Sequence, residues 1–232
     1  MEIITKRIFW VALMITLIIF LSVLLVANIL GLNREQVVDE RLNQLSADYK
    51  DINTLFLLSE VYGDEFYCIG LQTQLKDLDK SLWDTGAKIE NYQEASSTFV
   101  KDPYYTKLKT LFNQNLVYYL SLFKNYYAKC GHDGNVILYF YKNSRDCINC
   151  DSQSFVLTDI KEDMHDEVLI FSFDTDLGLK SIDALRQFYE IDNYPCLIIN
   201  EQKHCNLMDK DDILEELCLS DSGDYCQKYL SN

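Results

Sequence analysis

Two cysteines, Cys147 and Cys150, have the type and spacing to carry redox chemistry. Thiols that are two residues apart can close into a disulfide and open again by thiolate exchange. The apolar run 136–141 before them predicts a strand, and residues 151–163 after them predict a helix. A sulfur at a helix N-terminus faces unpaired backbone N–H groups, which favour the thiolate over the thiol. We therefore expect Cys147 to attack a disulfide and Cys150 to resolve the mixed disulfide that forms.

The elements that must position this pair alternate between strand and helix. The predicted strands are 136–141, 168–173, 196–200 and, after a turn at 201–203, a short return strand at 204–207. The predicted helices are 151–163, 179–190 and 210–217. Buried strands separated by helices predict a parallel pair joined by a crossover. The order β-α-β-α-β-β-α therefore predicts an α/β domain over residues 135–218.

Residues 135–218 resemble the thioredoxin superfamily in this element order and in two motifs. The first motif is Cys147-Ile-Asn-Cys150 between strand and helix, and the second is Tyr194-Pro195 just before an apolar strand. The acidic run Asp174-Thr-Asp176 after the second strand fits the same pattern. The resemblance implies thiol–disulfide oxidoreductase activity. It also implies that Pro195 is cis and places the backbone of Tyr194 beside the sulfurs, where a substrate strand can pair with it.

The chain departs from the thioredoxin superfamily at two points. The usual Trp-Cys-Gly-Pro-Cys sequence is absent, and Tyr141 stands six residues before the first cysteine, where thioredoxins keep a carboxylate. These departures leave an alternative open. Cys147 and Cys150 would then form a permanent bridge in a redox-silent thioredoxin-like module that docks partners.

The other six cysteines predict structural disulfides. Eight cysteines in 232 residues is an even and high number, typical of an oxidising compartment. The expected bundle places Cys68 and Cys130 at the same end, which suggests that they pair. Cys196 and Cys205 lie on one predicted hairpin and could form a cross-strand bridge, or Cys196 could instead communicate with the Cys147 pair. Cys218 and Cys226 enclose a turn-rich loop that a local bridge would close. A zinc site formed by the four cysteines Cys147, Cys150, Cys196 and Cys205 is possible on spacing alone. Because exported cysteines usually pair with each other, we expect no metal, and no cofactor motif is present.

The N-terminal region predicts a membrane anchor. Residues 8–31 contain no charged side chain, and 24 residues of helix span about 36 Å, enough to cross a bilayer. The segment Val26-Ala27-Asn28 is a poor cleavage site, which favours an uncleaved signal anchor over a signal peptide. The short flank with Lys6 and Arg7 favours residues 1–7 on the cytoplasmic side and the rest outside the cytoplasm.

Between the anchor and the α/β domain, residues 32–130 have apolar residues at spacings of three and four. This periodicity predicts an all-α, antiparallel helical bundle of three helices, a stalk standing about 40 Å off the membrane. Residues 219–232 are expected to be a C-terminal tail.

The net charge of −15 argues against nucleic acid as a partner, because such a surface repels phosphates. We expect a single-pass protein of the cell membrane that exchanges disulfides with exported cysteine-containing proteins. A further redox partner would regenerate the Cys147–Cys150 pair.

Overall fold

The structure is a computed structural model that describes residues 9–26, 40, 52–94, 103–131, 134–143, 145–219 and 223–231. The chain forms two compact units, residues 1–43 and residues 44–232. Residues 27–31 of the predicted span and most of the first predicted stalk helix lie outside the described residues.

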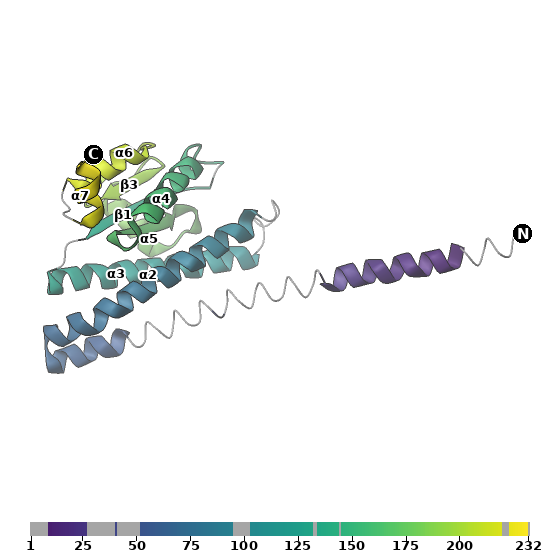
Figure 1. The fold of residues 1–232 in the computed structure, drawn as a ribbon, viewed down its shortest axis with the longest axis horizontal. Helices are drawn as coiled ribbons and strands as arrows, with labels where there is room; N and C mark the ends of the chain where they lie inside the picture. The colour runs from purple at the N-terminus through teal and green to yellow at the C-terminus, as the bar shows by residue number, and fades with distance from the viewer. Residues whose placement is uncertain are drawn as a thin grey trace, which may run out of the picture. The chain divides into compact units, whose positions relative to one another are not determined.

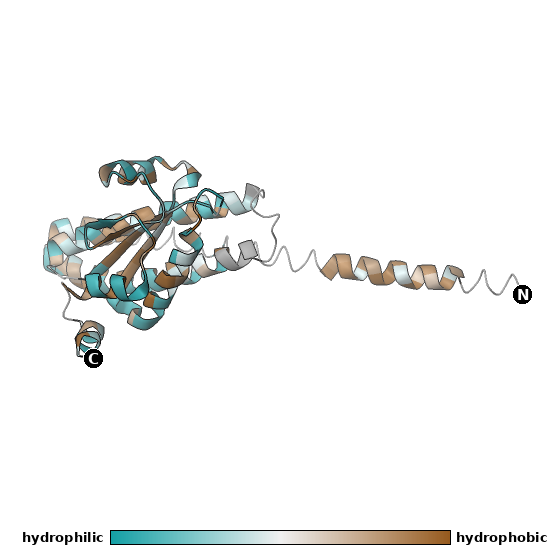
Figure 2. Ribbon diagram, turned by 90° about the horizontal axis from the view of Figure 1, so that it is seen from above, coloured by the Kyte–Doolittle hydropathy of each residue, from teal (hydrophilic) through white to brown (hydrophobic). Residues whose placement is uncertain are grey.

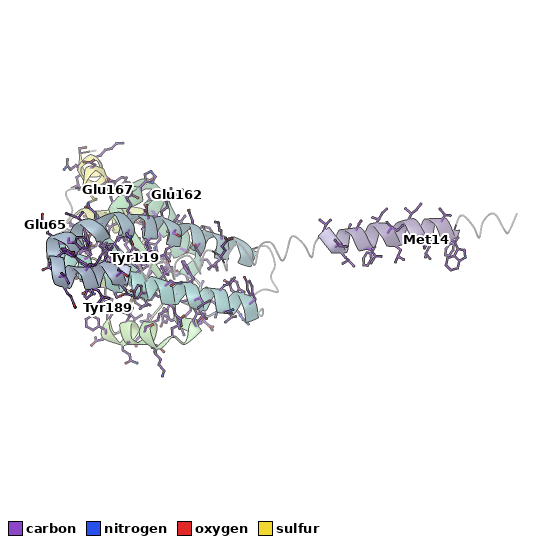
Figure 3. The ribbon with its side chains drawn as sticks, turned by 90° about the horizontal axis from the view of Figure 1, so that it is seen from below. Met14, Glu65, Tyr119, Glu162, Glu167 and Tyr189 are labelled. Atoms are coloured by element: carbon purple, nitrogen blue, oxygen red, sulfur yellow. A yellow bond between two sulfur atoms is a disulfide. The ribbon has the colours of Figure 1, made fainter. Side chains whose placement is uncertain are left out.

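The first unit contains an apolar helix, Phe9–Val26, that is long enough to cross a membrane (Figure 2). Its side chains, Met14 among them, project outward on all sides and are exposed (Figure 3). A helix that is apolar all round suits a membrane interior rather than water. It is the one such helix in the described part of the chain, and it can serve as a membrane anchor or as a signal sequence.

The second unit contains the predicted mixed α/β domain, built on a four-stranded sheet. The strands are β1 (Asn135–Tyr141), β2 (Val168–Asp174), β3 (Cys196–Ile199) and β4 (Gln202–His204), in the spatial order β2-β1-β3-β4 (Figure 1). β1 and β2 are parallel, whereas β1 with β3 and β3 with β4 are antiparallel. The helices of this domain are α4 (Cys150–Met164), α5 (Lys180–Phe188) and α6 (Lys210–Cys218). Short 3-10 turns separate α4 from β2 and β2 from α5.

The predicted return strand at 204–207 is wrong, because the hairpin turn is tighter than expected. Asn200 and Glu201 both have positive φ, 44° and 74°, so two residues complete the turn. The return strand β4 therefore starts at Gln202. This register places Leu197 opposite His204.

The segment 219–232, expected to be a tail, contains a further helix, α7 (Asp224–Leu230). Cys226 on α7 is fully buried and lies in the core together with Cys218, to which it is bonded. The C-terminus is therefore part of the domain.

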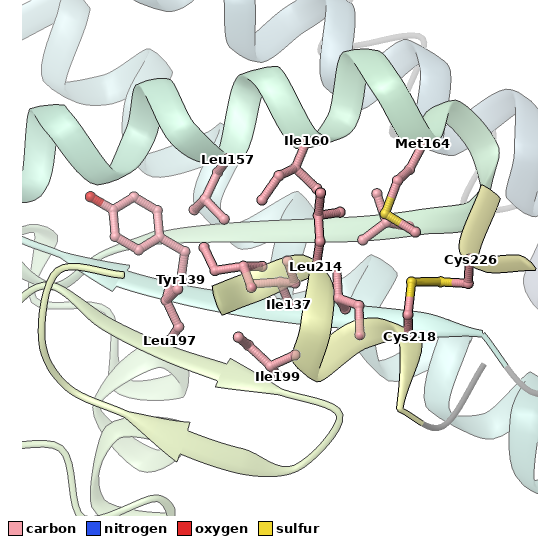
Figure 4. Packing of buried hydrophobic residues seen from close by; sticks show 13 residues of the cluster. Ile137, Tyr139, Leu157, Ile160, Met164, Leu197, Ile199, Leu214, Cys218 and Cys226 are labelled. Atoms are coloured by element: carbon pink, nitrogen blue, oxygen red, sulfur yellow. A yellow bond between two sulfur atoms is a disulfide. The ribbon is translucent and has the colours of Figure 1, made fainter. Parts of the chain in front are cut away.

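One face of the sheet packs against α4 and α6. Figure 4 shows this core, in which Ile137, Tyr139, Leu197 and Ile199 from the strands meet Leu157, Ile160 and Met164 of α4 and Leu214 of α6. Burial of each such aliphatic side chain stabilises the fold by about 1.5–3 kcal/mol. Alternation along β1 turns Phe140 to the opposite face, where its ring lies 5.4 Å from that of Phe173.

Helices α2 (Asp64–Glu94) and α3 (Pro103–Cys130) belong to the same compact unit as the sheet, and residues 52–62 are helical as well. The ring of Tyr119 on α3 lies 5.2 Å from that of Phe171 on β2. Phe123 packs on the same strand residue. The described helices therefore do not stand apart from the α/β elements, as the expected stalk would. They form a second layer beside the sheet.

Candidate functional site

The Cys147–Cys150 pair lies in the turn between the central strand β1 and helix α4. The two sulfurs are bonded, with their Cα atoms 5.5 Å apart. Helix α4 begins at Cys150 itself, one residue before the predicted start. The carbonyl oxygen of Asn143 accepts hydrogen bonds from the backbone N–H groups of Asp146 (2.9 Å) and Cys147 (3.1 Å). The pair is thus held between a hydrogen-bonded turn and the first residue of a helix.

The start of α4 presents backbone N–H groups near the pair. The N-cap residue Asn149 makes no side-chain capping bond, and the first helical bond runs from the Gln153 N–H to the Asn149 carbonyl (3.0 Å). The N–H groups of the first turn have no partner within the helix, so they favour a negative charge in this place. The buried hydroxyl of Tyr139 donates to the carbonyl of Cys150 at 2.6 Å, which joins the helix start to β1.

The sulfur pair is buried although the two residues between the cysteines are exposed. Cys147 and Cys150 are 4% and 2% exposed, whereas Ile148 is 92% exposed. A thiolate from another protein needs access to a sulfur before it can exchange. The bonded sulfurs therefore offer little surface to a thiolate from another protein.

Tyr194 and Pro195 lie at the same end of the sheet as the cysteine pair. They directly precede β3, which runs antiparallel to β1 with Cys196 opposite Phe140. The start of β3 therefore lies beside the end of β1, from which the cysteine turn departs. The Lys142 ammonium lies 5.1 Å from the centre of the Tyr194 ring, which links the two loops. The Tyr194–Pro195 peptide bond is cis, as the resemblance implies.

Tyr141 stands where thioredoxins keep a carboxylate, and the structure has a buried carboxylate beside it that comes from β2. Asp174 on β2 is opposite Tyr141 in the parallel register and is 4% exposed. Its Oδ2 lies 2.5 Å from Nζ of Lys109 on α3. Burial alone lowers the pKa of the Lys109 ammonium, but the Tyr141 side chain and the Asp174 carboxylate outweigh it and raise the pKa above its ordinary value.

The sequence analysis gave no individual role to three further residues at this end of the sheet, Asn143, Asp176 and Lys109. Asn143 forms the cysteine turn, and Asp176 accepts hydrogen bonds from both its backbone N–H (2.9 Å) and its side-chain amide (2.5 Å). The acidic run after β2 was a signal for Asp176. No pattern in the sequence pointed to Lys109, because its role depends on where α3 packs.

The structure pairs the remaining cysteines as the sequence suggests. Its disulfides join Cys68 to Cys130, Cys196 to Cys205, and Cys218 to Cys226, so that none of the eight thiols is free. Within the described ranges, no group of three or more His, Cys, Asp or Glu side chains is arranged to hold a metal ion.

No model of a known protein family matches the chain, and no curated protein matches it. Among solved structures, one described as "Structure of a malarial protein" shares 14% sequence identity with the chain. It has a TM-score of 0.32, with 37% of this chain and 94% of that chain covered. A TM-score this low does not establish a shared fold. What the chain does has to follow from the chemistry of the site.

Proposed function

We propose that the chain is a membrane-anchored, extracytoplasmic thiol–disulfide oxidoreductase of the thioredoxin-like superfamily. Its thioredoxin-like domain would cover residues 135–218, and its substrates would be exported proteins that contain cysteines. The four-stranded mixed sheet, with β1 parallel to β2 and antiparallel to β3, supports this proposal.

One observation carries the proposal. The Cys147–Cys150 disulfide lies between the end of the central strand and the first residue of α4. In that place, developing negative charge on a sulfur meets the N–H groups of the first helical turn, which lower the pKa of a thiol. In none of the other three disulfides do both cysteines lie at the start of a helix.

The exchange reaction moves two electrons. With the pair reduced, the Cys147 thiolate attacks a substrate disulfide, forms a mixed disulfide and releases one substrate thiolate. Cys150, after loss of its proton to water, attacks the Cys147 sulfur, closes the Cys147–Cys150 bond and releases the second substrate thiolate. The substrate is then reduced and the pair oxidised, and the reverse sequence oxidises a dithiol substrate. A second thiol or disulfide protein must restore the starting state of the pair.

Residues near the pair would receive the substrate chain. The backbone at Tyr194 and Pro195, at the same sheet end, would pair with an extended segment of the substrate next to its sulfur. Ile148 would contact the substrate from the other side, because its side chain is almost fully exposed.

The apolar helix Phe9–Val26 would anchor the enzyme in the cell membrane, with the N-terminus inside and the remaining chain outside the cytoplasm. Four disulfides fit this compartment, because thiols stay reduced in the cytosol. The acidic net charge makes nucleic acid an unsuitable partner.

A trapping experiment tests the proposal. In the full-length protein, Cys150→Ser removes the resolving thiol, so Cys147 is expected to retain exported proteins as mixed disulfides that dithiothreitol releases. Cys226→Ser is the matched control, because it also leaves one buried thiol unpaired, but Cys218 lies at the end of α6 and not beside the start of a helix. Equal trapping by both variants, or none by Cys150→Ser, would contradict the enzyme proposal.

The redox-silent docking module stays as a second candidate, because burial of both sulfurs is what a permanent bridge shows. Large apolar side chains also lie exposed at the corner between residues 52–62 and α2, namely Leu57, Val61, Tyr62 and Ile69. Such a surface is typical of partner binding. Graded reduction with glutathione separates the candidates. A catalytic pair opens before the other three bridges, whereas a structural pair opens together with them.

A further inference from the structure

The turn that carries Cys147 is organised by Asn143. The Asn143 carbonyl accepts from the N–H of Cys147, and its side-chain oxygen accepts from the N–H of Arg145 at 3.2 Å. The orientation of Asn143 therefore determines where the chain places Cys147 relative to Cys150.

Asn143 is in turn held by Asp176, which follows β2. Oδ2 of Asp176 accepts two hydrogen bonds from Asn143, one from the backbone and one from the side chain. A carboxylate forms stronger hydrogen bonds than a neutral acceptor does. Asp176 thus clamps the first residue of the cysteine turn to the other parallel strand.

Asp174 places Asp176 and connects it to the helical layer. Oδ1 of Asp174 accepts from the Asp176 N–H at 2.9 Å, while Oδ2 pairs with Lys109 of α3. The Asp174 N–H donates to the side chain of Asn113, also on α3, at 2.9 Å. Each oxygen of this buried carboxylate therefore has a different partner, one in the helical layer and one next to the cysteine turn.

These contacts form a continuous polar connection from Lys109 through Asp174, Asp176 and Asn143 to Cys147. We propose that Lys109, Asp174 and Asp176 are positioning residues that set the stability of the Cys147–Cys150 disulfide. Helix α3, which carries Lys109, would then influence the redox equilibrium of the pair. This inference rests on the proposed function. It adds that the helical layer tunes the reaction and does more than cover the sheet.

The direction of the effect follows from the geometry of the turn. The clamp holds the two Cα atoms 5.5 Å apart, a separation at which the two sulfurs can bond. Loosening the turn lets the reduced cysteines move apart and lowers the effective concentration of one thiol at the other. Loss of the clamp should therefore make the closed disulfide less stable against glutathione.

Two variants break the connection at different points in the full-length protein. Asp176→Ala removes the acceptor for Asn143, and Asp176 is exposed, so the fold should tolerate the change. Lys109→Met with Asp174→Leu removes the buried pair without leaving an unpaired charge. Each variant is expected to lower the equilibrium constant for closing Cys147–Cys150 against glutathione by about three- to tenfold.

Two further variants serve as matched controls. Asp176→Asn keeps an acceptor oxygen and should restore the constant to within about twofold of the wild type. Lys161→Met with Asp79→Leu removes the other buried ion pair between helices and domain, at the far end of α4 from Cys150. Lys161 also donates to the Val168 carbonyl, away from the cysteine turn, so loss of this pair should leave the constant within about twofold.

The outcomes separate this inference from the proposed function. If the wild-type pair does not equilibrate with glutathione, both are overturned. If the wild-type pair equilibrates but Asp176→Ala and the Lys109/Asp174 variant leave the constant unchanged, only the positioning role is overturned. An equal shift in the Lys161/Asp79 control would also overturn it, because the effect would then reflect general loosening of the helical layer.

Discussion

Lys161 on α4 and Asp79 on α2 form a buried ion pair, with Nζ 2.8 Å from Oδ2 and the side chains 8% and 16% exposed. Lys161 also donates to the carbonyl of Val168 at the start of β2, at 2.8 Å. The contact therefore joins three elements that are far apart in the sequence. It ties the helical layer to the α/β elements at the end of α4 remote from the cysteines.

Breaking this pair on one side should destabilise the protein strongly. Lys161→Met leaves the Asp79 carboxylate buried without its partner, and the free energy of unfolding should fall by about 3–5 kcal/mol. Urea unfolding with the disulfides intact measures the change. Lys76→Met is the control, because the Lys76–Asp166 pair is exposed and its loss should change the free energy of unfolding much less. Equal losses in both variants would contradict the assignment.

The same pair gives a pH prediction. Burial raises the pKa of Asp79 above its ordinary value of 3.8, although Lys161 opposes the shift. The folded state then keeps a proton that the unfolded chain has lost, so this group's contribution to stability falls as the pH rises from 3.8 through the folded pKa.

Removal of Lys161 should raise the pKa of Asp79 further, because Lys161 lowers it, and so widen the pH range over which stability falls. Lys161→Met and Lys161→Met/Asp79→Leu should differ least in stability near pH 3.8, because the raised pKa of Asp79 favours its protonated form at acid pH. The single variant should then lose up to about 1.4 kcal/mol per pH unit relative to the double variant as the pH rises. Urea titrations from acid to neutral pH measure the gap. A gap independent of pH would show that Asp79 is not the titrating group.

The Cys68–Cys130 bridge should be a large contributor to stability. It joins the start of α2 to the end of α3 across 62 residues of sequence, and chain-entropy estimates give about 4 kcal/mol for a loop of that length. Cys68→Ala with Cys130→Ala should lower the urea midpoint accordingly. A loss that is smaller than about 1 kcal/mol would mean that the unfolded chain already holds the two helices together.

Tyr139→Phe should weaken the start of α4. The variant removes the hydroxyl that donates to the Cys150 carbonyl, at an expected cost of about 1 kcal/mol in unfolding free energy. The control is Tyr62→Phe, at a position that is 67% exposed, where a change within about 0.5 kcal/mol is expected. Equal effects would show that the Cys150 contact contributes nothing.

The strands and helices of the α/β domain followed from local patterns in the sequence. Continuous apolar runs mark buried strands, and this pattern located β1, β2 and β3 to within one residue at each end. The hairpin between β3 and β4 was misplaced because Asn200 and Glu201 carry positive φ without a glycine to mark the turn. The helix α7 was missed because its seven residues follow a polar, turn-rich stretch and are placed by the packing of Cys226.

Only part of the candidate site could be predicted, because some of its features are local in the sequence and others depend on packing. A Cys-x-x-Cys spacing is local, so it could be found by inspection. The contact of Lys109 with Asp174 joins residues 65 positions apart in the sequence and depends on which face of α3 meets the sheet. Periodicity in α3 identified an apolar stripe, but it could not say whether other helices or a sheet would cover that stripe.

The packing of α3 on β2 limits how this protein can be rearranged in evolution. Separated from Tyr119 and Phe123, the strand–helix segment 135–218 would expose the ring of Phe171 and the neighbouring apolar face. Recombination between genes could move residues 44–232 as one folding unit. Transfer of residues 135–218 alone would leave the apolar face of β2 uncovered and prone to aggregation.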